Sequence, residues 1–350
     1  MDGVVIMNRS ILKIIRVINN KLLNFSFSRK LTYVLGKPNG IMIEPYSNCN
    51  YQCPLCPSGL KILKRNKVQM TFDEFKHNLG NLKYTTEYIT LFHFGEPLLN
   101  KELSKMVSYC HKYYISTQIS TNGALLTETM AMDLMQSGLD RIIFSIDTYD
   151  EKLYDKYRVN GEYNKVIKNI KMMVKLKKKI CSNTIIVAQY MIMNNNENID
   201  LMNKHGKSLG VDEVLIKTIG IGNSIEDYEE AKKFLPLNSN LSRYKQGTTL
   251  TKFNDFKCNY VWKRMVVCSD GVCLPCCRDQ RVDYILGVCN KKINLAKIWN
   301  NRNYRNFRRK TLNDIKSINM CDRCPEKLKY KLDPWVAEKN RKNCENFKLD

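Results

Sequence analysis

Three cysteines lie close together in one short segment of the sequence, Cys49, Cys53 and Cys56, with three and then two residues between them. Three thiolates on a four-iron cluster leave one iron without a protein ligand, and that iron can bind a small molecule through an amine and a carboxylate. A structural zinc site prefers four protein ligands, and the sequence offers no fourth one nearby. Pro54 and Pro57 stiffen the segment. The spacing therefore predicts an iron–sulfur cluster with one open iron rather than a zinc knuckle.

Alternating strand and helix patterns surround these cysteines. Strands are expected at 41–44, 88–94, 115–120, 141–146, 184–193 and 214–218. Helices are expected between them, at about 71–82, 101–113, 127–137, 163–179 and 198–209. Six such units predict an α/β fold with a parallel sheet, curved into a partial TIM-like barrel. The cysteine segment follows the first strand, at the carboxyl end, where such folds carry out their chemistry.

The 350 residues divide into four regions by pattern and composition. We expect a basic amphipathic helical extension at 1–37, the barrel at 38–219, a linker at 220–257 and a small cysteine-rich domain at 258–350. Nine of the fourteen cysteines fall in this last region. No run of 18 apolar residues and no secretory signal is present, so we expect a cytoplasmic protein. Because the cytosol keeps thiols reduced, the cysteines favour metal or redox chemistry over disulfides.

Positive charge is concentrated at the two ends of the chain. The formal net charge is +23, of which residues 1–40 contribute seven Lys/Arg against Asp2, and residues 258–350 contribute 21 Lys/Arg against 10 Asp/Glu. The N-terminal stretch alternates apolar and basic residues at helical spacing. It could contact a membrane surface or another protein, or it could pack on the main domain.

The cysteine segment resembles the signature of the radical S-adenosylmethionine (SAM) superfamily, whose fold is a partial (β/α)6 barrel. Polar motifs after successive strands resemble other elements of that family, although Phe94 replaces the first glycine of the motif that binds the methionyl amino group. Alone, each motif could be an ordinary turn or helix cap; their order along the chain favours the family. The resemblance implies cofactor contacts at Gly95, Glu96, Pro97, Ser120, Asn122, Ser145, Asp147 and Arg158.

The C-terminal cysteines resemble those of the SPASM extension of radical SAM enzymes. A full SPASM domain has further cysteines, and Tyr330 stands where the next one would fall, so the pattern resembles the shorter Twitch form. The resemblance implies that an auxiliary four-iron cluster is bound by Cys258, Cys276, Cys321 and Cys324. A zinc ribbon is the alternative for two pairs of cysteines. The other cysteines of this region, which we expect to be buried or to serve a further cluster, are Cys268, Cys273, Cys277, Cys289 and Cys344.

The resemblance also implies a reaction. A flavodoxin- or ferredoxin-type donor supplies an electron to the first cluster, which passes it to bound SAM. The reduced SAM is cleaved to methionine and a 5′-deoxyadenosyl radical. This radical abstracts a hydrogen atom from a substrate C–H bond. With two [4Fe-4S] clusters, one SAM-binding and one auxiliary, we expect an oxidoreductase. Its expected reaction is a two-electron oxidation (dehydrogenation) or a related modification of a small polar substrate, such as a sugar or aminocyclitol, as in the aminocyclitol dehydrogenase branch of the family.

Two other classes of function stay open at this point. One is a peptide- or protein-modifying maturase that performs epimerisation, cross-linking or formylglycine formation, although only 48 residues precede Cys49. The other is an iron–sulfur electron carrier or a nucleic-acid binder, for which the mixed aromatic and basic segment around Tyr304, Phe307 and Arg308 is the candidate surface. We expect that segment to be a helix packed by its aromatics instead. The sequence identifies no general base: His93, which precedes the Gly95-Glu96-Pro97 loop, could face the cavity, but a lone histidine at such a position is more often structural.

Overall fold

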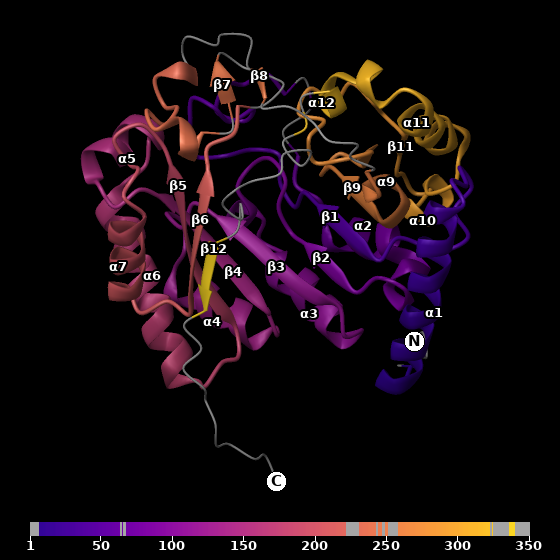
Figure 1. Cartoon of the computed structure of the whole chain (residues 1–350). Coiled ribbons are helices and arrows are strands. Elements are labelled where there is room, and N and C mark those ends of the chain that lie inside the picture. Colours follow the sequence, from indigo (N-terminus) through magenta and orange to yellow (C-terminus); the bar gives the residue numbers. More distant parts are fainter. Residues whose placement is uncertain are drawn as a thin grey trace.

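A ten-stranded sheet organises the molecule in the computed structural model (Figure 1), with the strand order β11-β10-β9-β1-β2-β3-β4-β5-β6-β12. The structure describes residues 7–63, 65, 68–221, 231–242, 244–246, 249–250, 258–322, 324 and 336–339. Within the run β9-β1-β2-β3-β4-β5-β6 every pair of adjacent strands is parallel. The open, linear strand order confirms the predicted partial barrel.

The six strands expected from the sequence are all present. They are β1 (Gly40–Ile43), β2 (Tyr88–Thr90), β3 (Ser116–Thr121), β4 (Arg141–Asp147), β5 (Ile185–Ile192) and β6 (Glu213–Thr218). Seven of the eight residues of β5 are buried, as expected for a parallel strand that is covered on both faces.

The helices of the barrel lie on the outer side of the curved sheet (Figure 1). They are α2 (Phe72–Leu79), α3 (Leu103–Lys112), α4 (Glu128–Gln136), α5 (Glu151–Tyr157), α6 (Tyr163–Lys179) and α7 (Ile199–Ser208), with 3-10 turns η1 (Gly80–Tyr84) and η2 (Pro97–Leu99). The five helices expected from the sequence are confirmed, and α5 is an addition. The capping box at the start of α2 is also present, because Thr71 and Glu74 each accept the other's backbone N–H.

The C-terminal region continues the barrel sheet. Strand β9 (Arg264–Val267) pairs in parallel with β1, and β10 (Val272–Leu274) and β11 (Gly287–Val288) extend the sheet in antiparallel fashion. At the opposite edge, β12 (Val336–Lys339) pairs with β6. One hydrophobic core runs through both regions, so no break in packing marks the expected boundary at residue 258.

Short helices complete the C-terminal region. They are α9 (Tyr260–Lys263), α10 (Leu295–Ile298), α11 (Arg302–Asn313), η4 (Ile315–Ser317) and α12 (Asn319–Asp322). The aromatic and basic segment belongs to α11, and its Tyr304, Phe307 and Arg308 are buried. Arg308 is stacked against Trp299 and Tyr304, with ring centroids 4.4 and 4.6 Å from its guanidinium carbon. These aromatics therefore pack α11 onto the core and do not form a surface for stacking bases.

The expected linker contains regular structure where the structure describes it. A 3-10 turn, η3 (Ser239–Leu241), precedes a two-stranded sheet of β7 (Tyr244–Gln246) and β8 (Thr249–Leu250). Tyr244 anchors this hairpin, because its hydroxyl accepts a hydrogen bond from the backbone N–H of Ile221 at 2.7 Å. The hairpin therefore returns to the residues that directly follow β6.

The N-terminal region forms the long helix α1 (Arg9–Ser28) and an extended stretch that leads to β1. The stretch is attached to the C-terminal region, because the indole N–H groups of Trp262 and Trp299 donate to the carbonyls of Leu31 and Gly36, both at 2.8 Å. The predicted helix is thus confirmed, and it packs on the main body of the protein at its outer edge (Figure 1).

Candidate cofactor and cluster sites

The predicted cluster cysteines lie on the loop that follows β1. The backbone N–H of Cys56 donates to the carbonyl of Cys53 at 3.1 Å, which makes a tight turn between them. Gly59 passes close behind this turn, because a Cβ atom there would lie 2.2 Å from the Cys53 carbonyl oxygen. The loop returns to its start through a bridge between Tyr46 and Gln69. The segment is therefore folded back on itself, with Cys53 and Cys56 on one turn and Cys49 just before it.

The three thiols influence one another electrostatically. Burial, with smaller contributions from Glu96 and the other two thiols, raises the pKa of Cys49 to about 12. Burial also raises the pKa of Cys53, and the nearby Arg158 opposes that shift. Since a metal ligand must be the thiolate, such a site needs positive charge from a bound metal. The predicted cluster would supply this charge, so the donor set fits it.

The loop after β2 packs directly on the cysteine loop. Gly95 has a φ of +76°, and a Cβ atom at this position would lie 2.1 Å from the Tyr46 carbonyl oxygen. The next backbone N–H, that of Glu96, donates to the carbonyl of Asn48 at 2.7 Å. A glycine is thus required at position 95. Phe94, which replaces the first glycine of the family motif, is buried at 7% exposure.

The Glu96 carboxylate is buried beside the cysteine loop. It accepts hydrogen bonds from the Thr121 hydroxyl at 2.5 Å, the Asn122 backbone N–H at 2.9 Å and the Leu98 backbone N–H at 3.1 Å. Burial raises the pKa of Glu96, and these donors oppose the rise. Three donors leave room on its two oxygens for one more. The carboxylate can therefore receive an amino group, as the motif implies.

Polar side chains from three neighbouring strands form a row near this carboxylate. The hydroxyls of Ser120 on β3 and Ser145 on β4 are 3.4 Å apart, and the Gln189 amide on β5 donates to Ser145 at 3.2 Å. Asn122, which follows β3, donates to Asn50 Oδ1 at 2.9 Å. The predicted Ser120, Asn122 and Ser145 thus lie on adjoining strand ends. Gln189 joins the row without any motif signal in the sequence.

Arg158 and Asp147 form a buried ion pair beside the cysteine loop. One Arg158 nitrogen lies 3.7 Å from the Cys53 sulfur. Burial works against the positive charge, but Asp147 and Cys53 together raise the pKa of Arg158 well above its usual value. Arg158 Nε and Asp147 Oδ1 have no hydrogen-bond partner among the described residues. Arg158 Nε can therefore donate to a carboxylate of a cofactor, and Asp147 Oδ1 can accept a hydrogen bond from a donor group of a cofactor.

The four predicted auxiliary ligands line one pocket. Cys258, Cys276, Cys321 and Cys324 all face it, with apolar neighbours that include Phe307. The pKa of Cys276 is raised well above its usual value by a hydrogen bond with Cys277 and by burial. The pocket therefore brings together cysteines that are more than 60 positions apart in the sequence. Four converging sulfur ligands suit either a closed four-iron cluster or a zinc ion.

The remaining cysteines lie outside this pocket lining. Cys273 and Cys289 are buried on neighbouring strand segments with their sulfurs 3.7 Å apart. Cys268 is fully buried at the end of β9, and Cys277 is half-buried beside Cys276. Cys344 lies outside the described residues. Cys268, Cys273 and Cys289 are therefore buried, as expected of packing residues.

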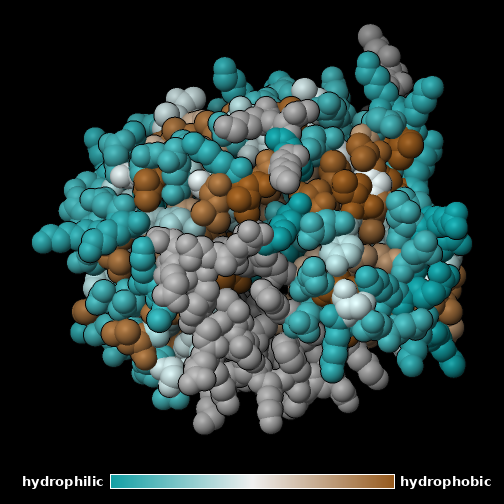
Figure 2. Space-filling model, turned by 90° about the horizontal axis from the view of Figure 1, so that it is seen from above, coloured by the Kyte–Doolittle hydropathy of each residue, from teal (hydrophilic) through white to brown (hydrophobic). Residues whose placement is uncertain are grey.

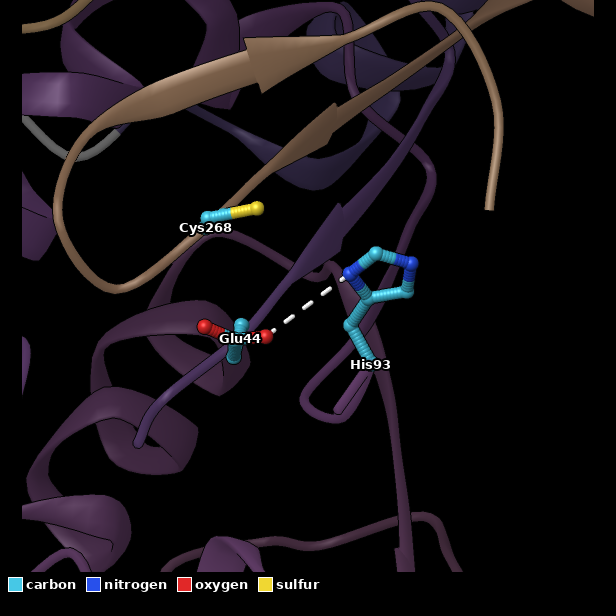
Figure 3. A group of neighbouring side chains, drawn as sticks. All are labelled: Glu44, His93 and Cys268. Atoms are coloured by element: carbon cyan, nitrogen blue, oxygen red, sulfur yellow. Dashed lines mark ion pairs between the residues drawn. The ribbon is translucent and has the colours of Figure 1, made fainter. Parts of the chain in front are cut away.

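A buried polar cluster that the sequence analysis missed joins the barrel to the C-terminal region (Figure 3). Glu44, one residue past β1, pairs through both oxygens with Arg65 at 2.9 Å. It also accepts from the backbone N–H groups of Phe94 and Ser269. His93 Nδ1 lies 3.8 Å from the Glu44 carboxylate, and the Cys268 sulfur completes the group. Because Arg65 already neutralises the carboxylate, this cluster is an ion-pair junction.

His93 therefore has a structural position. Its ring is completely buried, its Nε2 lies 3.4 Å from the Cys277 carbonyl oxygen, and burial lowers its pKa to about 4 despite the proximity of Glu44. A neutral imidazole at this position links the loop after β2 to the cysteine-rich region. The sequence signal for this junction was weak, because Glu44 and Arg65 belong to no motif.

The face seen from above carries a band of apolar residues within a mostly hydrophilic surface (Figure 2). A charged cavity of about 280 Å³ adjoins the auxiliary pocket and shares Arg278 and Met320 with it. Arg281 and three aspartates also line this cavity. Its walls therefore suit a polar molecule. Among the described residues, no helix is long and apolar enough to cross a membrane.

Comparison with protein families identifies both regions. A model of the radical SAM superfamily matches residues 43–202, and a model of the SPASM iron–sulfur cluster-binding domain matches residues 258–325. Among curated proteins, an uncharacterized protein of Methanocaldococcus jannaschii is 32% identical over 131 residues, which cover 37% of this chain but only 42% of that protein. A GTP 3′,8-cyclase of Clostridium botulinum is 26% identical over 286 residues, or 75% of this chain and 88% of that protein.

Solved structures share the fold at low sequence identity. Streptococcus suis SuiB bound to its precursor peptide SuiA has a TM-score of 0.59 and 15% identity, and the match covers 83% of this chain and 71% of that chain. BtrN in complex with AdoMet and 2-DOIA has a TM-score of 0.50 and 19% identity, and the match covers 81% and 92%. At these identities the likeness shows a shared fold.

Proposed function

We propose that this chain, which belongs to the radical SAM superfamily and carries a SPASM domain, catalyses the two-electron oxidation of a C–H group in a small polar substrate. The two domains imply SAM and two [4Fe-4S] clusters as cofactors. When bound, these groups supply a reductively generated 5′-deoxyadenosyl radical and a second site for electrons. The protein's own contribution is to bind, orient and exclude water.

In this proposal Cys49, Cys53 and Cys56 bind the first cluster and leave one iron for the cofactor. Their position on one loop after β1 supports this role, and so does their electrostatic coupling. Three protein thiolates require a cluster with an open corner. The unfavourable burial of these thiols would be relieved by the positive charge of the iron.

The methionyl end of SAM would lie between Glu96 and Arg158. Glu96 is an acceptor with one site to spare, and Arg158 Nε is a donor without a described partner. A guanidinium suits a carboxylate because its N–H groups form a two-pronged donor. Gly95 permits the close approach of the two loops that carries Glu96 to this position, and Pro97 starts the turn that holds it.

The adenosyl end of SAM would then lie along the row of polar strand ends. Ser120 and Ser145 are hydrogen-bonded to each other, and Asn122 donates to Asn50, so their hydroxyl and amide groups are held in place. Asp147 has a φ of +66° and follows a register shift in β4, which turns its carboxylate toward Arg158. We expect this carboxylate to orient the guanidinium for the cofactor.

The single observation that carries the oxidation is the pocket lined by four cysteines. If Cys258, Cys276, Cys321 and Cys324 all bind one cluster, every iron has a protein ligand, and the cluster can exchange electrons but cannot bind substrate. Such a site can take the second electron from a substrate radical. The charged cavity beside it supports a polar substrate.

Iron analysis tests this proposal directly. The wild-type protein, reconstituted under anaerobic conditions, should hold about eight irons. The double variant Cys321→Ala/Cys324→Ala should hold about four, should still form 5′-deoxyadenosine, and should yield no oxidised product. The matched control is Cys273→Ala, a buried cysteine outside the pocket, which should leave the iron content unchanged. About one zinc and four irons in the wild type would contradict the electron-acceptor role.

A peptide or protein substrate is the second candidate. SuiB, which shares the fold, is bound to a precursor peptide in its structure, and the C. botulinum relative is named for a reaction of GTP. The fold therefore accommodates both classes. A screen of reduced protein, SAM and candidate substrates separates them, because a peptide product changes in mass or chirality whereas a small polar product is found in the peptide-free fraction.

Two further features belong to the proposal. A flavodoxin- or ferredoxin-type donor would supply electrons, and the protein would act in the cytoplasm, where thiols and clusters stay reduced. The N-terminal helix would serve as a contact surface of the molecule. Titration of the oxidised protein, in the presence of SAM, with reduced flavodoxin should yield 5′-deoxyadenosine and methionine if the donor class is correct.

A further inference from the structure

Helix α1 exposes a row of large apolar side chains. Ile14, Ile18 and Phe25 are 60%, 53% and 48% exposed, and Ile11 and Leu22 are 49% and 36% exposed. The spacing of three and four residues places all five on one face of the helix. From Ile11 to Phe25 the row is about 21 Å long at 1.5 Å per residue. An amphipathic helix ordinarily turns such a row toward the protein core.

Polar anchors hold the helix in this orientation. Asn19 on the inner face donates to the Lys37 carbonyl at 2.8 Å and accepts from the Lys37 backbone N–H at 2.7 Å. Arg16 donates to the carbonyls of Tyr113 and Tyr114 at 2.8 and 2.7 Å, at the end of α3. Since these contacts fix the rotation of the helix about its axis, the fold itself directs the apolar row outward.

Positive charge borders the row at Lys21, about 60° around the helix from Ile18, and at Arg29, whose guanidinium carbon lies 5.7 Å from the centroid of the Phe25 ring. The helix contains no Asp or Glu. An apolar row with a basic border is the pattern of helices that lie in a membrane interface. The side chains of the row also carry no hydrogen-bonding group, so they suit lipid tails.

We propose that α1 docks the protein on an anionic membrane surface, with the apolar row in the acyl boundary and the basic residues at the lipid headgroups. A second copy of the chain fits less well, because two such helices would bring like charges together, whereas helix pairs use opposite charges beside the seam. This inference rests on α1 and is independent of the reaction proposed above.

The test is co-sedimentation of the reconstituted, full-length protein with vesicles. Phosphatidylcholine vesicles that contain phosphatidylserine should bind the protein, binding should decrease with added salt, and pure phosphatidylcholine vesicles should bind it weakly. Ile18→Asp places a charge in the centre of the row and should lower binding about tenfold or more. The matched control is Asn24→Asp, which adds the same charge to an exposed polar residue about 120° around the helix from Ile18 and should change binding little.

Several results would overturn the inference. Equal binding of Ile18→Asp and wild type to anionic vesicles would exclude the row as the contact. A concentration-dependent dimer that Ile18→Asp abolishes, without vesicle binding by the wild type, would assign the row to a second copy. Thermal unfolding and 5′-deoxyadenosine formation, measured on the same samples, should be unchanged in both variants, so a folding defect or a failed reaction is distinguishable from lost docking.

Discussion

Replacement of Glu44 by alanine should strongly destabilise the protein. The side chains of Glu44 and Arg65 are 0% and 5% exposed, and the carboxylate accepts from both Arg65 and the Ser269 hydroxyl and backbone. Removal of one partner leaves the other charge buried without compensation, which costs about 3–5 kcal/mol. A typical protein is stable by about 5–15 kcal/mol, so the loss is a large fraction of the total.

A double-mutant cycle separates this effect from the loss of packing. Glu44→Met/Arg65→Met replaces the pair with apolar groups and should recover most of the stability that either single variant loses. The control is Glu162→Ala, which removes an exposed pair with Lys165 and should have little effect. The assay is urea unfolding of the anaerobic holoprotein, followed by circular dichroism. If Glu44→Ala shifts the midpoint no more than Glu162→Ala, the reasoning is refuted.

Three more changes test the junction, the cysteine loop and the cofactor site. Because burial lowers the pKa of His93 to about 4, the unfolded chain, with an ordinary pKa near 6.5, takes up the proton first as the pH falls. The free energy of unfolding should therefore decrease by about 3 kcal/mol between pH 6.5 and 4, and His93→Gln should flatten this part of a pH series of unfolding midpoints. Gly59→Ala forces a Cβ atom against the Cys53 carbonyl and should remove about four of the eight irons; an unchanged iron content would show that the loop can shift. Arg158→Lys loses the two-pronged donor and should weaken SAM binding about tenfold in calorimetry, whereas an unchanged Kd would exclude Arg158 from the cofactor site.

The local features of the protein were predictable from its sequence. The six barrel strands follow from short apolar runs between helical patterns, and the capping box at Thr71 is a local signal as well. The spacing of Cys49, Cys53 and Cys56 indicated the site, because these residues lie within one loop. In each case the residues that determine the structure are neighbours along the chain.

The features that were missed depend on long-range contacts. The pairing of β9 with β1 joins residues more than 200 positions apart, and no periodicity indicates such a register. The Glu44 junction combines the cysteine loop, the loop after β2 and the start of the C-terminal region. The outward orientation of α1 likewise depends on Asn19 and Arg16, whose partners lie elsewhere in the chain. Helical periodicity predicts an apolar face but does not say which face meets the core.

The most direct test of the central claim is the iron content and SAM cleavage of the triple variant Cys49→Ala/Cys53→Ala/Cys56→Ala. The account predicts about eight irons and 5′-deoxyadenosine from the reduced wild type, and about four irons with no 5′-deoxyadenosine from the variant. The auxiliary cluster would then remain in its own pocket, with its absorbance intact. Formation of 5′-deoxyadenosine by the triple variant, or an iron content equal to that of the wild type, would contradict the account.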